Sequence, residues 1–186
     1  FCGSGTIPIE AALIAKNRAP GLNRSFAAQS WDCLDKRIWL DAAEEAMDRE
    51  FHGSYEIWGG DIDPEAVEIA RHNAEIAEVD DTVQFEVADA TRFHWGGLYG
   101  RVVTNPPYGE RLMERREAEA LYSAFGRSMD KLPDTWRVAV LSSHTEFERC
   151  FGRPAVKKRK LYNGMIKCGL FFYGKRNPSP QIRHDS

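Results

Sequence analysis

The sequence lacks long hydrophobic runs and paired metal-ligand motifs. No apolar stretch approaches the roughly 20 residues that a membrane helix needs, so we expect no membrane partner. The four cysteines form no CxxC pair and no zinc-type spacing with histidines, so we expect no metal. Scattered single thiols are typical of a reducing compartment, and a cytoplasmic protein is therefore expected.

The chain also lacks a strong net charge. A formal charge of −3 over 186 residues excludes a nucleic-acid-binding protein that acts through bulk composition alone. The length suits one domain with a substantial core. We expect the folded domain to occupy residues 1–176, and we expect the polar tail, residues 177–186, to be disordered.

Short apolar runs alternate with helical patterns along the chain. Strands are expected at residues 55–58, 83–87, 101–104 and 136–142, and helices after Thr6, at 38–50, after Asp63, at 117–131 and at 147–151. Two further strand patterns, 156–162 and 165–173, are joined by Asn163-Gly164, which favours a hairpin. The order predicts a Rossmann-like α/β sheet closed by a hairpin.

Polar motifs follow the first part of this pattern. The turn Cys2-Gly3-Ser4-Gly5-Thr6 precedes a helix, with Thr6 as the expected N-cap and Pro8 in the first turn. Such a turn brings backbone close to a ligand at the positive end of a helix. Asp61 follows the strand at 55–58, and its carboxylate could accept hydrogen bonds from two ribose hydroxyls. The alternatives are an ordinary glycine turn and a solvated loop acid.

The next two strand ends carry Asp89 and the tetrapeptide Asn105-Pro106-Pro107-Tyr108. Asp89 either caps the following turn or accepts a hydrogen bond from an adenine amino group. The tetrapeptide predicts a rigid turn that holds an amide, two backbone carbonyls and an aromatic ring. Asn-Pro alone would be an ordinary turn, but the whole tetrapeptide at a strand end, after the other motifs, favours a ligand site.

The last third of the chain is basic. Residues 151–176 contain eight lysines and arginines and no acidic residue. A basic hairpin beside a ligand edge predicts phosphate contacts. Lysines that protect an exposed edge strand explain the same pattern equally well.

The motifs in this order resemble those of class I S-adenosylmethionine-dependent methyltransferases that modify exocyclic amines. The sequence also resembles the catalytic domain of the THUMP-associated RNA methyltransferases at residues 1–12, 60–64, 105–112 and 160–164. That family includes the 23S rRNA guanine-N2 methyltransferases of the large-subunit type and proteins labelled as N6-adenine DNA methylases. The resemblance implies a Rossmann-like methyltransferase sheet with helices on both faces and a C-terminal antiparallel hairpin.

The resemblance also implies roles for individual residues. S-adenosylmethionine would contact Cys2, Gly3, Ser4, Gly5 and Thr6 through its methionine part, Asp61 through its ribose, Ile62 through one adenine face, and Asp89 and Ala90 through the adenine edge. Asn105, Pro106, Pro107 and Tyr108 would form the catalytic turn, with Asn105 also close to the cofactor and Tyr108 stacked on the target base. Arg111, Lys160 and Asn163 would meet the RNA.

The resemblance implies further sequence before Phe1. In the family, a first strand ending in an acid and a proline precedes the glycine turn, and a THUMP domain docks RNA. We therefore expect residues 1–186 to lack the first strand and to be unstable or inactive alone. The resemblance implies methylation of an exocyclic amine in RNA, with guanine N2 of 23S rRNA as the first expectation. Two other functions stay open, namely adenine N6 methylation of DNA and a non-catalytic RNA-binding or ribosome-assembly role. A nicotinamide-dependent oxidoreductase leaves the tetrapeptide unexplained.

Overall fold

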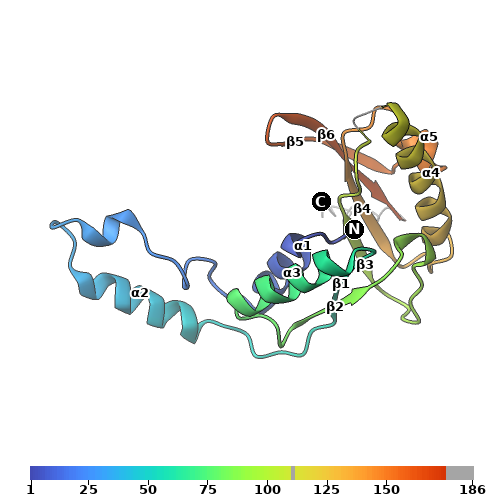
Figure 1. The fold of residues 1–186 in the computed structure, drawn as a ribbon. Coiled ribbons are helices and arrows are strands. Elements are labelled where there is room, and N and C mark those ends of the chain that lie inside the picture. The colour runs from blue at the N-terminus through green and yellow to red at the C-terminus, as the bar shows by residue number, and fades with distance from the viewer. Residues whose placement is uncertain (110–111, 175–186) are drawn as a thin grey trace, which may run out of the picture. The chain divides into compact units, whose positions relative to one another are not determined.

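The computed structural model, drawn in Figure 1, describes residues 1–109 and 112–174. The chain divides into two compact units. The amino-terminal unit comprises Cys2–Val87, and the carboxy-terminal unit comprises Phe1 and the chain from Ala88 onward. Both units combine helices and strands, which confirms the α/β class. Across the described ranges, no helix has the length and apolar character needed to cross a membrane. Arg111 and the predicted tail, 177–186, lie outside the described residues.

The amino-terminal unit is built on two parallel strands, β1 (Ile57–Asp61) and β2 (Val83–Val87), with Asp61 opposite Val87. Helices α1 (Thr6–Lys16) and α3 (Pro64–Ile76) pack against this pair. The 3-10 helix η1 (Ala27–Ser30) and α2 (Lys36–Asp48) lie between α1 and β1 in the chain. The core consists of apolar side chains from α1, α3 and the strands, namely Ile9, Ala12, Leu13, Val67, Ala70, Ala74, Val79, Val83 and Phe85.

Strand β1 lies later in the chain than the predicted strand at 55–58. It includes Gly59, Gly60 and Asp61, which the sequence had placed in the following turn. These residues belong to the strand because they pair with β2, with Gly59 opposite Phe85. A Cβ atom on Gly59 would lie 2.5 Å from the Phe85 ring and 3.1 Å from Pro8. A glycine inside the strand is thus what lets the Phe85 ring lie across it.

Helix caps agree with the sequence at one end and differ at another. Asp63 caps α3 as predicted, because its carboxylate accepts a hydrogen bond from the Glu65 amide at 2.9 Å. Thr6 was predicted as the N-cap of α1, but Gly5 takes that position with a φ of 84°, and Thr6 is the first helical residue. Helix α2 begins at Lys36 rather than at residue 38, because Asp35 caps it through the Arg37 amide at 2.9 Å.

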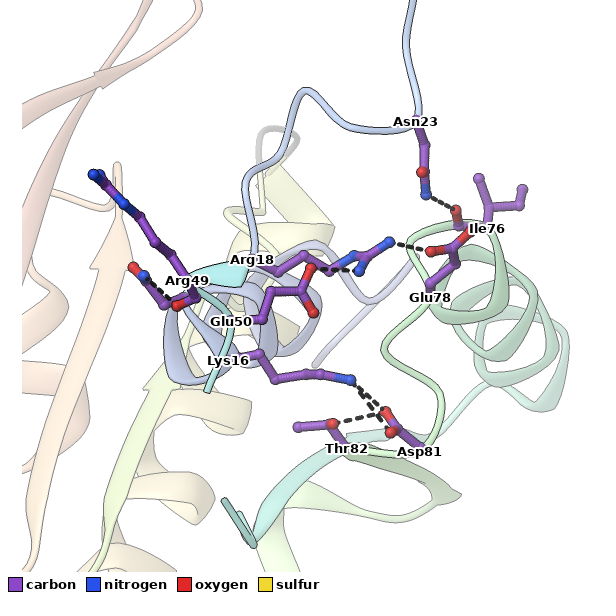
Figure 2. A network of polar contacts seen from close by, with 10 residues as sticks. Lys16, Arg18, Asn23, Arg49, Glu50, Ile76, Glu78, Asp81 and Thr82 are labelled. Carbon is purple, nitrogen blue, oxygen red and sulfur yellow. Dashed lines mark hydrogen bonds and ion pairs between the residues drawn. The ribbon is translucent and has the colours of Figure 1, made fainter. Parts of the chain in front are cut away.

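Polar contacts connect the ends of the helices in the amino-terminal unit (Figure 2). Arg18 pairs with Glu50 at 2.6 Å and with Glu78, and both Arg18 and Glu50 are largely buried. Lys16 reaches Asp81 at 3.1 Å. These contacts tie the end of α1 to the segment after α2 and to the loop after α3.

The carboxy-terminal unit holds a four-stranded sheet in the order β3-β4-β6-β5. Strands β3 (Arg101–Thr104) and β4 (Arg137–Ser142) are parallel, and β6 (Ile166–Tyr173) is antiparallel to β4 and to β5 (Lys157–Asn163). The helices are the 3-10 helix η2 (Ala90–Arg92), α4 (Leu112–Met129) and α5 (Phe147–Phe151). Helix α4 begins at Leu112 rather than at the predicted residue 117, with Glu114 as a favourable acid in its first turn.

An aromatic core joins α4 and α5 to this sheet. The ring of Phe147 lies 4.9 Å from those of both Tyr122 and Phe171, and the ring of Phe151 lies 4.4 Å from that of Tyr173. These side chains are buried, as are Val138 and Val140 of β4. Alternate residues of β4 therefore face the helices, as a half-covered strand requires.

The predicted hairpin is confirmed, but its turn lies one residue later. Asn163 pairs with Ile166, so the two turn residues are Gly164 and Met165 rather than Asn163 and Gly164. Gly164 has a φ of 59°, which suits the first central position of a type II′ turn. Asn163 consequently belongs to β5, and its side chain direction is fixed by the strand.

Candidate active site

The Asn105-Pro106-Pro107-Tyr108 turn begins directly after β3. Thr104 and Pro106 are buried, whereas Pro107 is exposed. The side-chain carbonyl oxygen of Asn105 is buried and has no hydrogen-bond partner among the described residues. Leaving a buried acceptor unpaired costs about 1–3 kcal/mol, so such an atom calls for an explanation, and a ligand donor is one.

A buried tyrosine on α4 contacts this turn and fixes its position. The Tyr122 hydroxyl donates a hydrogen bond to the Pro107 carbonyl oxygen at 2.5 Å. Tyr122 is fully buried in the aromatic core, and burial raises the pKa of its hydroxyl. The hydroxyl therefore keeps its proton at neutral pH and remains a donor to the turn.

The hairpin holds the other end of the turn. The Tyr108 hydroxyl oxygen accepts hydrogen bonds from Asn163 Nδ2 of β5 at 3.3 Å and from Cys168 Sγ of β6 at 3.5 Å. Burial raises the pKa of Tyr108, so the phenol stays neutral. The structure thus brings together two predicted site residues, Tyr108 and Asn163.

The sequence did not single out Tyr122 or Cys168. Both are far in sequence from the residue that they contact, since Tyr122 follows Pro107 by 15 residues and Cys168 follows Tyr108 by 60. The apolar spacing of the helix predicted at 117–131 indicates that Tyr122 faces the core. That spacing does not indicate which backbone oxygen the Tyr122 hydroxyl contacts. Of the predicted RNA contacts, Lys160 is exposed on β5, with its Nζ 5.3 Å from the centre of the Tyr162 ring.

The amino-terminal unit holds the glycine turn against Asp61. The Gly3 amide donates to Asp61 Oδ2 at 2.8 Å, and the Asp63 amide donates to Oδ1 at 3.2 Å. Burial alone would raise the pKa of Asp61, but these amide bonds outweigh it and the pKa lies below its usual value. Asp61 is therefore charged at neutral pH and is oriented by the turn.

The surroundings of Asp61 leave room for a ligand. A Cβ atom built on Gly3, whose φ is 53°, would meet no heavy atom within 4 Å. Ile62 follows Asp61 and is 67% exposed, although it is apolar. The Cys2 amide donates to the Gly60 carbonyl at 2.9 Å, which fixes the turn to β1, and the hydroxyls of Ser4 and Thr6 lie 3.4 Å apart. A charged acceptor next to an exposed apolar side chain fits a ribose and an adenine ring.

Asp89 caps η2 in the carboxy-terminal unit. Its Oδ1 accepts from the Thr91 hydroxyl at 2.8 Å and from the Thr91 amide at 2.9 Å, and these bonds lower the pKa of Asp89. The Ala90 carbonyl accepts from the Ser128 hydroxyl at 3.1 Å. The capping role is confirmed, and the contact of Asp89 and Ala90 with an adenine stays a prediction.

Glu119, His144 and Cys150 lie together beside the aromatic core, with ligand-type atoms within 4.8 Å of one another. The Glu146 amide donates to His144 Nδ1 at 3.2 Å, so the neutral ring carries its proton on Nε2. That nitrogen lies 3.2 Å from Glu119 Oε1. A metal ion on Nε2 would require the ring proton to lie on Nδ1, where it would face the Glu146 amide donor, so this cluster fits a buried histidine–carboxylate contact better than a metal site.

A carboxylate held by a glycine turn at one strand end, and an Asn-Pro-Pro-Tyr turn with an open amide oxygen at another, are features of a class I methyltransferase domain. The family comparison specifies which one. The chain belongs to the UPF0020 family, described as the RMKL-like methyltransferase domain, whose profile matches residues 1–171. This membership confirms the methyltransferase class predicted from the motifs.

Named relatives agree with this family. The chain is 44% identical over 174 residues to "Putative RNA methyltransferase YpsC" of Bacillus subtilis (strain 168), a match that covers 93% of this chain and 45% of the relative. It is 40% identical over 178 residues to "Ribosomal RNA large subunit methyltransferase K/L" of Shewanella baltica (strain OS185), which covers 93% of this chain and 25% of the relative. The chain thus spans less than half the length of these relatives.

Solved structures confirm the Rossmann-like methyltransferase fold class. "A possible methylase from Clostridium difficile 630" has a TM-score of 0.91 at 47% identity, covering 96% of this chain and 48% of that chain. "SMU.472, a putative methyltransferase complexed with SAH" has a TM-score of 0.89 at 40% identity, covering 95% and 47%. SAH, S-adenosylhomocysteine, is the product left when S-adenosylmethionine gives up its methyl group, which agrees with the predicted cofactor.

Proposed function

We propose that this domain transfers the methyl group of S-adenosylmethionine to an exocyclic amine of a base in RNA. The observation that carries the proposal is the buried side-chain carbonyl of Asn105, which lacks a hydrogen-bond partner among the described residues. It lies on a turn whose following residues are held by Tyr122 and by the hairpin. An acceptor kept open on a fixed turn suits an amine donor from a substrate.

The acceptors of the turn would activate that amine. An exocyclic nitrogen is a poor nucleophile, because its lone pair is conjugated with the base. Asn105 Oδ1 and the Pro106 carbonyl would each accept one amine hydrogen, which directs the lone pair out of the ring plane. The Pro107 carbonyl already accepts from Tyr122, so one of its two lone pairs is engaged by the protein itself. The nitrogen forms the new N–CH₃ bond as the S–CH₃ bond breaks, and the nitrogen then loses a proton to solvent.

S-adenosylmethionine supplies a methyl group that its sulfonium centre has already activated, so positioning provides much of the catalysis. In the amino-terminal unit, the Gly3 turn would hold the methionine part, Asp61 the ribose hydroxyls and Ile62 an adenine face. The charged state of Asp61 and its bond to Gly3 support this assignment. The contacts of Asp89 and Ala90 with the adenine edge stay predictions from the family resemblance.

The proposed substrate is guanine N2 in 23S ribosomal RNA. Its support is the Shewanella relative named for large-subunit ribosomal RNA, together with the basic strand β5 beside Tyr108. The target base must leave its helix to reach the turn, where the Tyr108 ring would stack on it for about 1–3 kcal/mol. A THUMP domain in the full-length protein and a cytoplasmic location belong to the same proposal.

The test is Asn105→Ala in the full-length protein, with turnover on RNA and cofactor affinity measured separately. Turnover should fall about 100-fold or more, as when a single aimed hydrogen bond is removed from an active site. Cofactor affinity should stay within about threefold. Asn23→Ala is the matched control, because it removes an amide that bonds to the Ile76 carbonyl in the amino-terminal unit. Undiminished turnover by the Asn105 variant would show that the assigned role is wrong.

A second candidate is methylation of adenine N6 in DNA. A solved relative described as "a predicted N6-adenine-specific DNA methylase from Listeria monocytogenes str. 4b F2365" has a TM-score of 0.84 at 43% identity, covering 94% of this chain and 45% of that chain. The tetrapeptide recognises an amine and does not distinguish the two bases. Mass spectrometry of nucleosides from RNA and DNA of a deletion strain separates the candidates, because only the true product disappears.

A further inference from the structure

The hairpin ends in a fully exposed apolar side chain. Met165 is the second residue of the tight turn between β5 and β6, and it is 98% exposed. Turns of this kind normally carry polar residues or glycine. Single exposed apolar side chains are common on protein surfaces, so it is the position of Met165, beside the basic strand and the Asn105–Tyr108 turn, that calls for an explanation.

The surface around Met165 is complementary to RNA. Every residue of β5 is exposed, and four successive residues, Lys157 to Lys160, are basic. Tyr162 is 62% exposed, and the Lys160 ammonium lies over its ring. Lysines guarding an edge strand would account for the charge, but not for an exposed tyrosine and methionine at the tip. Cations mixed with flat and apolar side chains are what phosphates and bases require.

The same tip is connected to the catalytic turn. Asn163 immediately precedes Gly164, and its side-chain amide donates to the Tyr108 hydroxyl at 3.3 Å. Cys168, on the returning strand, donates to the same oxygen. The ring that would stack on the target base and the exposed methionine therefore belong to one hydrogen-bonded assembly within the carboxy-terminal unit.

A base that leaves a helix leaves a gap in the stack, and enzymes that extrude a base must offset the lost stacking. Apolar side chains such as methionine can enter between base steps and fill such a gap. The extruded base stays close to the gap that it leaves in the stack. A side chain that fills this gap must therefore lie near the pocket that receives the base.

We propose that Met165 is a wedge that enters the RNA helix at the position of the target base while Tyr108 receives that base. Tyr162 and Lys160 contact the adjoining base and phosphate. This inference rests on the proposed function, because it requires a base in RNA as the substrate. It assigns a strand-separating role to the hairpin tip, distinct from the chemistry of Asn105.

The test compares Met165→Ala with the wild type in the full-length protein on two RNA hairpins. In the first, the target guanine is paired, and in the second it faces an abasic site and is already unpaired. The variant should lose about tenfold in kcat/KM on the paired target and stay within about twofold on the unpaired one. Met165→Leu, which keeps an apolar side chain of similar size, should restore most of the activity on the paired target.

Leu98→Ala is the matched control, because Leu98 is 72% exposed and lies in the same unit. It should leave both rates unchanged. Equal losses of the Met165 variant on the two hairpins, or no loss on either, would overturn the wedge alone. A wild-type protein that methylates neither RNA would overturn the proposed function, and the two failures are therefore distinguishable.

Discussion

The hydroxyl of Tyr122 is the contact whose removal tests the site most directly. Tyr122→Phe deletes one oxygen and leaves a ring of the same shape in a fully buried position. The Pro107 carbonyl then loses its 2.5 Å hydrogen bond. A net hydrogen bond contributes about 0.5–1.5 kcal/mol, and because Pro107 is exposed, water can replace the donor. We expect the free energy of unfolding to fall by about 1 kcal/mol.

The effect on catalysis should be larger than the effect on folding. If the released turn positions the amine acceptors about 1–2 kcal/mol less favourably in the transition state, kcat falls by roughly 5–30-fold. The KM for RNA and the affinity for S-adenosylmethionine should change by less than about threefold, since neither ligand contacts Tyr122 in the proposed arrangement. Single-turnover methylation, cofactor titration and urea unfolding measure the three quantities.

Tyr173→Phe provides a matched control. Tyr173 is also a buried tyrosine of the aromatic core, but its hydroxyl has no hydrogen-bond partner among the described residues. Removing that hydroxyl should leave kcat unchanged and should not lower stability. A Tyr122→Phe enzyme with full kcat, or an equal loss of kcat in Tyr173→Phe, would refute a positioning role for Tyr122.

Two predictions concern the amino-terminal unit. Because the folded pKa of Asp61 is lowered, its carboxylate stabilises the fold at neutral pH, and this contribution is lost as pH falls below about 4 and through the folded pKa. Thermal unfolding from pH 7 to pH 2 should therefore show a smaller pH dependence in Asp61→Asn than in the wild type, and parallel curves would contradict the assignment. Arg18→Met breaks the largely buried contact with Glu50 and should lower the free energy of unfolding by about 1.5–3 kcal/mol. Lys16→Met breaks a more exposed pair with Asp81 and should cost less than about 1 kcal/mol in urea unfolding, so equal losses would argue against burial as the cause.

Local signals made much of the fold predictable. The cap at Asp63 and the parallel strand ends follow from short-range patterns, because a cap or a strand depends on neighbouring residues. The contact between Gly3 and Asp61 joins two predicted motifs, since carboxyl ends of neighbouring strands and the turns beside them meet at one edge. The family resemblance supplied the methyltransferase class, which the comparisons confirm.

Features that depend on distant packing were not predictable. Gly59 pairs with Phe85 and leaves room for its ring, and nothing near Gly59 in the sequence indicates that pairing. The bonds from Tyr122 and Cys168 to the Asn105–Tyr108 turn depend on how α4 and β6 pack. The turn of the hairpin shifted by one residue, because strand register decides which glycine-containing pair turns. The ligand contacts of individual residues stay predictions.

Strand β5 has a consequence for how such a domain can diversify. All seven of its side chains are exposed, whereas its neighbour β6 carries the buried Cys168, Phe171 and Tyr173. Substitutions at exposed positions usually change stability by less than about 0.5 kcal/mol. Most of the outer strand can therefore change in sequence while the core and the Asn105–Tyr108 turn are kept unchanged.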